Sequence, residues 1–188
     1  ERWFKPTLPH SVIQNGADTG IFFPRGISAA PPSPLKLVTH HWSDNWMKGF
    51  KVYQEIDDLI ATGKLKDFEL NVIGRWPKEI HWKTARTHQP ASGQQLADLL
   101  RANHVYVTAS LWEPCGMHHI EGAQCGLPLV YHLDGGGIVE FGKRYGIGFS
   151  ENVSNALLEV RERYFELAEK VRNKPPSGSE MCAAYEKI

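Results

Sequence analysis

Neither sign of charge predominates in this sequence. Lysine and arginine together number 21, as do aspartate and glutamate, so the formal net charge at pH 7 is zero when the histidines are neutral. A chain without excess positive charge has no long-range attraction to nucleic acid or to an anionic membrane surface. We therefore expect no nucleic-acid partner, and we look for function in a local site.

Long apolar runs and paired cysteines are also missing. No apolar segment is long enough to span a bilayer, and no basic leader followed by an apolar run stands at the start. The 3 cysteines, Cys115, Cys125 and Cys182, are odd in number and show no paired spacing, which is typical of a reducing compartment. These absences predict a soluble, cytoplasmic protein without a disulfide framework.

The order of turn residues and periodic segments divides the chain into three parts. Residues 1–34 contain Asn-Gly and Pro/Ser-rich stretches without a helical period, and we interpret them as a connector between domains. Residues 35–152 carry the regular pattern of a folded domain, and residues 153–188 predict C-terminal helices. The 188 residues suffice for one domain with a sizeable core.

Short apolar runs alternate with helical periods in the central part. Strands are predicted where β-branched and apolar residues fill a short run between turn residues, at residues 35–40, 68–74, 104–110 and 127–132. Helices are predicted at residues 50–63, 92–103, 116–125 and 153–172, with a last short helix near the end. Gly63 is expected to end the first helix, and Ser92 to cap the second. The alternation predicts an α/β fold, a Rossmann-like parallel sheet with helices on both faces, whose ligands bind at the carboxyl ends of the strands.

The segment EPCGMHHIE, residues 113–121, follows a predicted strand and opens a predicted helix. If the helix begins near Gly116, the free N–H groups of its first turn favour a negatively charged ligand. Glu113 precedes this helix start and Glu121 lies just inside it. Because carboxylates accept hydrogen bonds from vicinal hydroxyls, the pair suits a sugar and a ribose at the two ends of a phosphate linkage.

Other uses of this segment are also considered. Cys115, His118, His119 and Cys125 are zinc-binding residue types, but their gaps repeat no finger or ribbon spacing, and we predict no metal site. Adjacent histidines point about 100° apart on a helix, so only one of the two faces the site, and the sequence does not say which. A cysteine nucleophile would need a base with a third orienting group, and none is evident.

Three tryptophans lie near the same predicted strand ends. Trp42, Trp46 and Trp112 form either a platform on which a sugar stacks or a surface that another domain covers.

Four motifs, and their order along the chain, resemble those of family 4 glycosyltransferases with the GT-B fold. Glu113 and Glu121, with seven residues between them in EPCGMHHIEGAQCGLP, are similar to the E-x7-E signature. Lys48-Gly49 resembles the KG pair that opens the first helix of the family's donor-binding domain. VIQNGADTGIFFP is similar to the connector between the family's two domains, and GLPLVYHLDGGGIVEF to the stretch after the signature. The resemblance spans roughly residues 12–150.

The resemblance implies the C-terminal, nucleotide-sugar-binding domain of a retaining, metal-independent glycosyltransferase. Such enzymes transfer a sugar from a nucleoside-diphosphate sugar to an acceptor hydroxyl. The implied catalytic residues are Glu113, at the transferred sugar, and Lys48, at the diphosphate, while Glu121 holds the ribose. Further donor-binding residues implied are Gly49, Cys115, Gly116, Met117 and His118, with the nucleobase near Pro90 and Ala91.

The resemblance also implies partners. These are the nucleotide-sugar donor, an N-terminal GT-B domain that this chain lacks, and a glycan or lipid-linked acceptor. The nucleotide sugar is the substrate, and no further cofactor is expected. Peripheral membrane association of the full-length enzyme and little activity of the isolated domain are further expectations.

One departure from the family pattern concerns charge. Family members carry an arginine five or six positions before the phosphate lysine, where this chain has Ser43 and Trp42. His41, Asn45 and Arg75 are the candidates for a replacement. The departure leaves open a second interpretation, a noncatalytic nucleotide-sugar-binding or regulatory module of the same fold.

Overall fold

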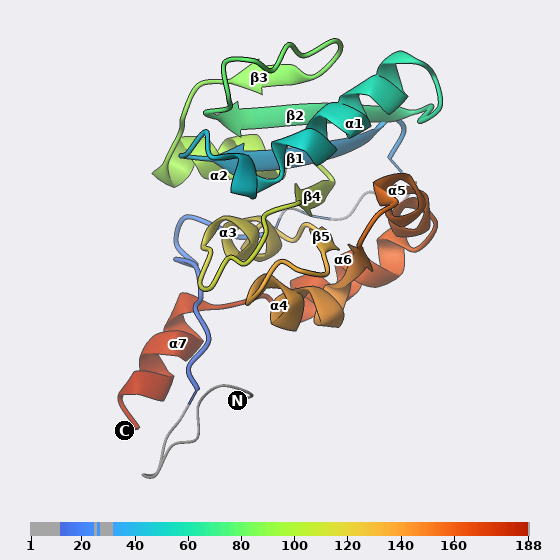
Figure 1. Ribbon diagram of the computed structural model, residues 1–188. Helices are drawn as coiled ribbons and strands as arrows, with labels where there is room; N and C mark the ends of the chain where they lie inside the picture. The colour runs from blue at the N-terminus through green and yellow to red at the C-terminus, as the bar shows by residue number, and fades with distance from the viewer. Residues whose placement is uncertain (1–11, 25, 27–31, 188) are drawn as a thin grey trace.

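Six parallel strands form one sheet in the computed structural model, which describes residues 12–24, 26 and 32–187. The sheet order is β3-β2-β1-β4-β5-β6, and all neighbouring strands pair in parallel (Figure 1). The strands are β1 (Leu35–His41), β2 (Phe68–Gly74), β3 (Arg86–His88), β4 (Val105–Thr108), β5 (Leu129–His132) and β6 (Gly146–Phe149).

Helices cover both faces of this sheet. They are the 3₁₀ helix η1 (Trp46–Lys48) and the α-helices α1 (Phe50–Ala61), α2 (Gly93–Arg101), α3 (His118–Gln124), α4 (Ile138–Tyr145), α5 (Val153–Glu162), α6 (Tyr164–Asn173) and α7 (Gly178–Tyr185). Successive strand residues point to opposite faces. Leu37 accordingly packs in one core with residues of α1 and α5, and Val38 packs in a second core with residues of α2, α3 and α4. The predicted Rossmann-like sheet with helices on both faces is confirmed.

Strands β3 and β6, the α-helix α4 and the 3₁₀ helix η1 are not predicted from the sequence. Strand β3 has three residues and none is buried, so it carries no apolar run. Strand β6 contains two glycines, which weaken a strand pattern, and the short helix α4 directly precedes it. The four predicted strands and the helices between them are present, and Phe50, Tyr53 and Ile56 form the buried stripe expected of α1.

The prediction of one helix over residues 153–172 is wrong. The chain breaks at Arg163, whose φ of −99° and ψ of 15° are not helical, and α5 and α6 lie on either side. Val160 before the break and Leu167 after it both pack in the first core, whereas Val171, one turn further along α6, packs in the second. The Arg163 guanidinium bonds Glu159 at 2.8 Å and Glu166 at 3.0 Å across the break. Apolar residues of both helices are buried.

A buried carboxylate holds the chain in place next to the β3 edge of the sheet. Asp57 of α1 is 1% exposed and accepts hydrogen bonds from the backbone N–H groups of Lys83, Thr84 and Ala85 at 2.5, 2.9 and 2.8 Å. The Thr84 hydroxyl donates a fourth bond at 2.6 Å. Asp57 thus ties α1 to the segment that leads into the edge strand β3.

Helix α7 lies beside the segment of residues 12–24, away from the sheet (Figure 1). Ala17 pairs with Ser177 in an isolated parallel bridge, with N–H···O distances of 3.1 Å from Ala17 to Pro176 and 2.8 Å from Gly178 to Ala17. Part of the predicted connector, residues 1–11, 25 and 27–31, lies outside the described residues. The division at residues 34 and 152 stays a prediction.

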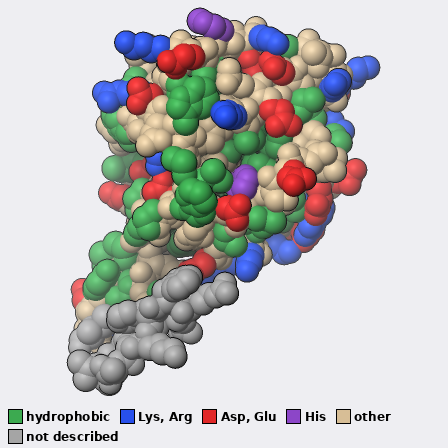
Figure 2. All heavy atoms as spheres, viewed as in Figure 1, with side chains coloured by type: hydrophobic (Ala, Val, Ile, Leu, Met, Phe, Trp, Pro, Cys, Tyr) green, Lys and Arg blue, Asp and Glu red, His purple; other side chains and the backbone are tan. Residues whose placement is uncertain are grey.

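The described surface is mixed in charge. On the face shown in Figure 2, basic and acidic side chains alternate without a field of one sign, as the net charge of zero leads one to expect. Among the described residues, no helix is long and apolar enough to cross a membrane.

Candidate functional site

The candidate site lies where β1 and β4 end at the carboxyl edge of the sheet. These strands pair in parallel with Leu37 opposite Val105, so the loops that follow them leave the sheet side by side. A hydrogen bond of 2.8 Å from Leu111 N–H to Met47 O joins the two loops. Between them is a cavity of about 310 Å³ lined by His40, His41, Trp42, Ser43, Lys48, Glu113, Cys115, Gly116, Met117, His118 and Glu121.

Lys48 enters this cavity because Gly49 lets its loop approach β4. Gly49 has a φ of 84°, and a Cβ atom there would lie 2.3 Å from Ala109 O. The side chain of Asn45 caps η1 by accepting from Met47 N–H at 2.9 Å. The Lys48 ammonium donates to Glu113 Oε2, and the two side chains are only 25% and 18% exposed. Gly49 itself does not line the cavity.

A glycine-rich turn holds Glu113 in place. Residues 134–137, the DGGG sequence, lie alongside it, with N–H···O distances of 3.2 Å from Glu113 to Gly135 and 3.0 Å from Gly137 to Glu113. A Cβ atom at Gly136, where φ is 72°, would lie 2.7 Å from Glu113 O. The preceding Trp112 has a φ of 48°, which is rare for a bulky residue, and it is held by a 2.8 Å bond from its N–H to Asp134 O. The turn therefore fixes the backbone from which the Glu113 carboxylate projects.

Glu121 reaches the same cavity from α3. Its Oε2 lies 3.0 Å from Nε2 of His40, a residue of β1 that is 3% exposed. Glu113 and Glu121 thus face one cavity from two elements. His40 is not among the site residues predicted from the sequence, although its place at the end of a buried strand, beside a predicted ligand loop, is a signal for it.

Two histidines in the cavity wall are neutral. Burial lowers the pKa of His41 well below its usual value, and its Nε2 lies 3.0 Å from the Tyr53 hydroxyl. Burial, followed by the neighbouring His41, lowers the pKa of His118 in the same way, and its Nε2 lies 3.2 Å from Thr108 Oγ1. Neither imidazole supplies a positive charge at neutral pH.

The candidates for a second cation do not supply one. His41 is neutral, and the Asn45 side chain is used as a cap. The Arg75 guanidinium lies 3.5 Å from Trp42 O and is absent from the cavity lining. Lys48 is therefore the one lysine or arginine among the described residues that line the cavity.

The other predicted residues divide into two groups. Cys115, Gly116, Met117 and His118 form the wall between the two glutamates, whereas Pro90 and Ala91 do not line the cavity. Ala91 is buried in the core beside α2, and Ser92, the N-cap of that helix, makes no capping bond with its side chain.

Helix α3 begins later than predicted. It starts at His118, with Met117 as N-cap, and not near Gly116. A Cβ atom at Gly116 would lie 2.7 Å from Glu113 Cγ, so residue 116 belongs to the tight loop that brings the chain past Glu113. Of the two adjacent histidines, His118 faces the cavity, and His119 turns toward the Phe141 ring at 5.4 Å.

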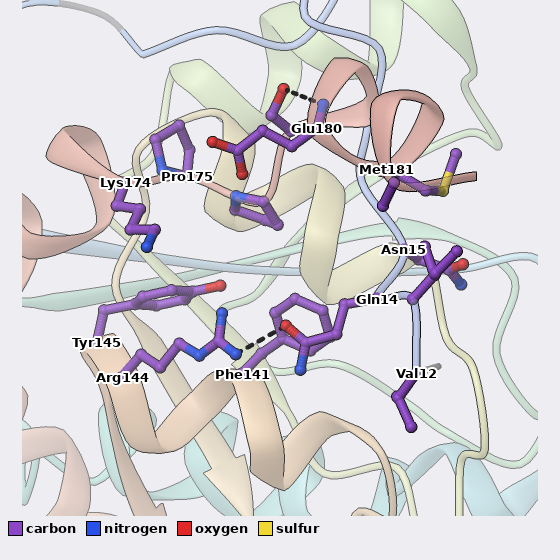
Figure 3. A pocket seen from close by; sticks show the side chains of 14 residues that line it. Val12, Gln14, Asn15, Phe141, Arg144, Tyr145, Lys174, Pro175, Glu180 and Met181 are labelled. Atoms are coloured by element: carbon purple, nitrogen blue, oxygen red, sulfur yellow. Dashed lines mark hydrogen bonds between the residues drawn. The ribbon is translucent and has the colours of Figure 1, made fainter. Parts of the chain in front are cut away.

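A second, larger cavity of about 450 Å³ lies between residues 12–15, the end of α4 and the start of α7 (Figure 3). Arg144 donates to Gln14 Oε1 there at 2.7 Å. Its charged lining residues are Arg144, Lys174 and Glu180, and it contains none of Lys48, Glu113 and Glu121. Both cavities are lined by charged side chains, and we favour the smaller one because the two carboxylates of the 113–121 segment and the Lys48 ammonium meet there.

Comparison with known proteins supports the fold. No family model matches the sequence, and no curated protein matches it. The sucrose-phosphate synthase of Thermosynechococcus elongatus is similar in structure, with a TM-score of 0.71 and 16% identity over 99% of this chain. The C-terminal domain of a group 1 family glycosyl transferase from Francisella tularensis gives a TM-score of 0.60 at 16% identity, covering 92% of this chain and 100% of that one.

A third similar structure is the catalytic domain of starch synthase IV from Arabidopsis thaliana bound to ADP and acarbose, with a TM-score of 0.61 and 17% identity over 86% of this chain. This chain spans 53% of the sucrose-phosphate synthase chain and 39% of the starch synthase chain. The protein has the fold of the C-terminal domain of GT-B glycosyltransferases, as the sequence motifs led us to expect.

Proposed function

We propose that the cavity between β1 and β4 binds a nucleoside-diphosphate sugar, and that the chain is the donor-binding domain of a retaining glycosyltransferase. The observation that carries the proposal is the placement of Glu113 and Glu121 in one cavity, on either side of the loop of residues 115–118. Two carboxylates held apart in this way match a ligand with hydroxyls at both ends and phosphates between. The solved structures with this fold that are glycosyltransferases support the same class of reaction.

In the proposed mechanism, Lys48 acts on the leaving group. Negative charge grows on the diphosphate as the bond to the sugar breaks, so an ammonium already fixed at that place stabilises the transition state more than the ground state. In the structure the ammonium is paired with Glu113. Binding of the donor would exchange part of this pairing for a phosphate oxygen and free Glu113 to accept from hydroxyls of the transferred sugar. No step requires a metal ion.

The proposal extends to partners. The acceptor is a glycan or a lipid-linked molecule whose hydroxyl attacks the sugar, and an N-terminal GT-B domain supplies most of the acceptor site. The full-length enzyme works in the cytoplasm, in contact with a membrane surface where the acceptor is a lipid.

One observation favours the second candidate, a noncatalytic nucleotide-sugar-binding module. The described lining has two carboxylates and a single lysine, so a diphosphate enters a cavity that holds little positive charge. Such a site can bind a nucleotide through its ribose while stabilising the leaving group poorly.

Calorimetry with UDP, GDP, ADP and their sugars tests the proposal. At least one should bind, and Lys48→Ala should weaken binding of the diphosphate by about tenfold or more while leaving the matching nucleoside unaffected. Lys51→Ala, in the exposed first turn of α1, is the matched control and should bind like the wild type. A folded wild type that binds none of these nucleotides would refute the proposal.

Assays of donor hydrolysis and transfer, with an N-terminal GT-B domain supplied in trans, separate the two candidates. Release of the sugar with retention at the anomeric carbon supports the transferase. Nucleotide binding without any turnover supports the noncatalytic module.

A further inference from the structure

Glu121 is the last member of a buried chain of hydrogen bonds. His40 Nε2 lies 3.0 Å from Glu121 Oε2, and the other ring nitrogen of His40, Nδ1, lies 3.1 Å from the Tyr106 hydroxyl. The backbone N–H of His40 donates to the same hydroxyl at 3.2 Å. His40 is 3% exposed and Tyr106 is fully buried, so water does not compete for these bonds.

The chemistry of each atom fixes the direction of these bonds. An ionised carboxylate only accepts, so the proton of a neutral His40 must be on Nε2. Nδ1 then presents a lone pair and accepts from the Tyr106 hydroxyl. That hydroxyl receives the backbone N–H of His40 on its oxygen and gives its proton to Nδ1, so each donor has one acceptor. Burial raises the pKa of Tyr106 well above its usual value, which keeps this proton in place.

The packing of α3 brings Glu121 within reach of His40. A Cβ atom at Gly122 would lie 2.4 Å from Cδ2 of Tyr106, so only glycine lets the helix approach the Tyr106 ring so closely. The rings of His40 and Tyr106 meet edge to face at 5.6 Å. One tyrosine thus holds both the imidazole and the helix that carries the carboxylate.

We propose that His40, held by Tyr106, is a positioning residue that occupies one oxygen of Glu121 and aims the other at the ribose hydroxyls of the bound nucleotide. Oε1 of Glu121 has no hydrogen-bond partner among the residues that the structure describes, and the side chain is 22% exposed at the cavity. This assignment rests on the proposed function, and it predicts that the site prefers ribonucleotides to their 2′-deoxy forms. A free carboxylate could rotate among several partners, whereas one tied through Oε2 presents Oε1 in a single direction.

The first test measures the unliganded protein. Nitrogen-15 NMR of the histidine rings should show His40 as the Nε2–H tautomer in the wild type, and Tyr106→Phe should lose this single tautomer. A proton on Nδ1 of His40 in the wild type overturns the assignment, whatever the protein binds.

The second test compares each bound nucleoside diphosphate with its 2′-deoxy form by calorimetry. The wild type should prefer the ribose form by about tenfold, because the deoxy form leaves a charged acceptor without its hydroxyl. His40→Phe, which keeps a ring but has no donor, should reduce this preference to about twofold or less. His40→Gln, whose amide nitrogen can still donate to Oε2, should restore most of it.

Controls keep the outcomes distinct. His81→Gln, at an exposed histidine, should leave the ratio unchanged, and circular dichroism establishes that each variant is folded. Nucleotide binding with an unchanged ratio in His40→Phe overturns the assignment but not the proposed function. If no ribonucleotide binds the folded wild type, the proposed function fails, and the assignment fails with it.

Discussion

His119 shows how a single buried residue sets the pH dependence of stability. Its side chain is 1% exposed, and neither ring nitrogen has a hydrogen-bond partner in the described part of the chain. Burial lowers its pKa from 6.5 to about 4. Between these values the unfolded chain binds a proton at this position and the folded chain does not, so the free energy of unfolding falls as the pH falls from 6.5 toward 4.

We expect His119→Phe to flatten this dependence. Phenylalanine fills the place beside the Phe141 ring and cannot take up a proton, so the variant should lose about 3 kcal/mol less than the wild type between pH 7 and 4. Urea unfolding at several pH values measures the difference. His41 and His118 also have lowered pKa values, so some dependence should remain. Parallel curves for the variant and the wild type would contradict this account, and His81→Gln is the control.

The residues of the site could be predicted from the sequence only in part. Lys48, Glu113 and Glu121 are found by motif spacing, and the structure brings all three to one cavity. That His118 faces the cavity and His119 does not depends on where α3 begins. The helix begins at His118, two positions after the predicted start near Gly116. His40 and Tyr106 are 66 positions apart and meet only because β1 pairs with β4, which no local pattern records.

At the scale of elements, the approach of the η1 loop to β4 depends on one glycine. Gly49 and Gly63 both have left-handed φ angles, of 84° and 72°. A Cβ atom added at Gly49 would lie 2.3 Å from Ala109 O, whereas one added at Gly63 would have no heavy atom within 4 Å. Gly63→Ala should therefore lower the free energy of unfolding by about 1 kcal/mol, the cost of the backbone angle alone. Gly49→Ala should lower it by about 3 kcal/mol or more, because the loop must also move.

Urea unfolding of the two variants measures this difference, and nucleotide binding gives a second readout. Gly49→Ala should weaken binding, since the displaced loop carries Lys48, whereas Gly63→Ala should not. Equal losses of stability in the two variants would show that the contact with Ala109 is unimportant.

Elements with a strong pattern were predictable, and those without one were not. β1 and β2 are seven-residue strands buried at every position but one and rich in apolar and β-branched residues, and the buried stripe of α1 has helical spacing. β3 has no buried residue, and its place in the sheet follows from pairing with β2 and from the Asp57 contacts. The break at Arg163 leaves no mark in the apolar pattern, because Val160, Leu167 and Val171 continue one helical stripe across it.

For the molecule as a whole, a bound nucleotide should raise stability by mass action. A ligand that binds only the folded chain adds about 2.7 kcal/mol to the free energy of unfolding at a concentration one hundred times its Kd. Thermal unfolding with increasing nucleotide should therefore give a rising Tm, and the rise should be smaller for Lys48→Ala at the same concentration. Duplex DNA should give no such rise, because basic and acidic side chains balance (Figure 2). A nucleotide that binds by calorimetry but leaves the Tm unchanged would mean that it also binds the unfolded chain.

The hydrogen bonds of the Asp57 carboxylate affect whether separate molecules of the protein can associate. Its four donors hold the chain that leads into β3 against the end of α1, and β3 closes one margin of the sheet. Without that acceptor, the N–H groups of Lys83, Thr84 and Ala85 would lose their partner, and the short outer strand would be held less firmly. The next strand inward, β2, is seven residues long and rich in apolar side chains, and its uncovered backbone is a template for pairing with another molecule. We therefore expect this one acidic side chain to limit self-association of the protein.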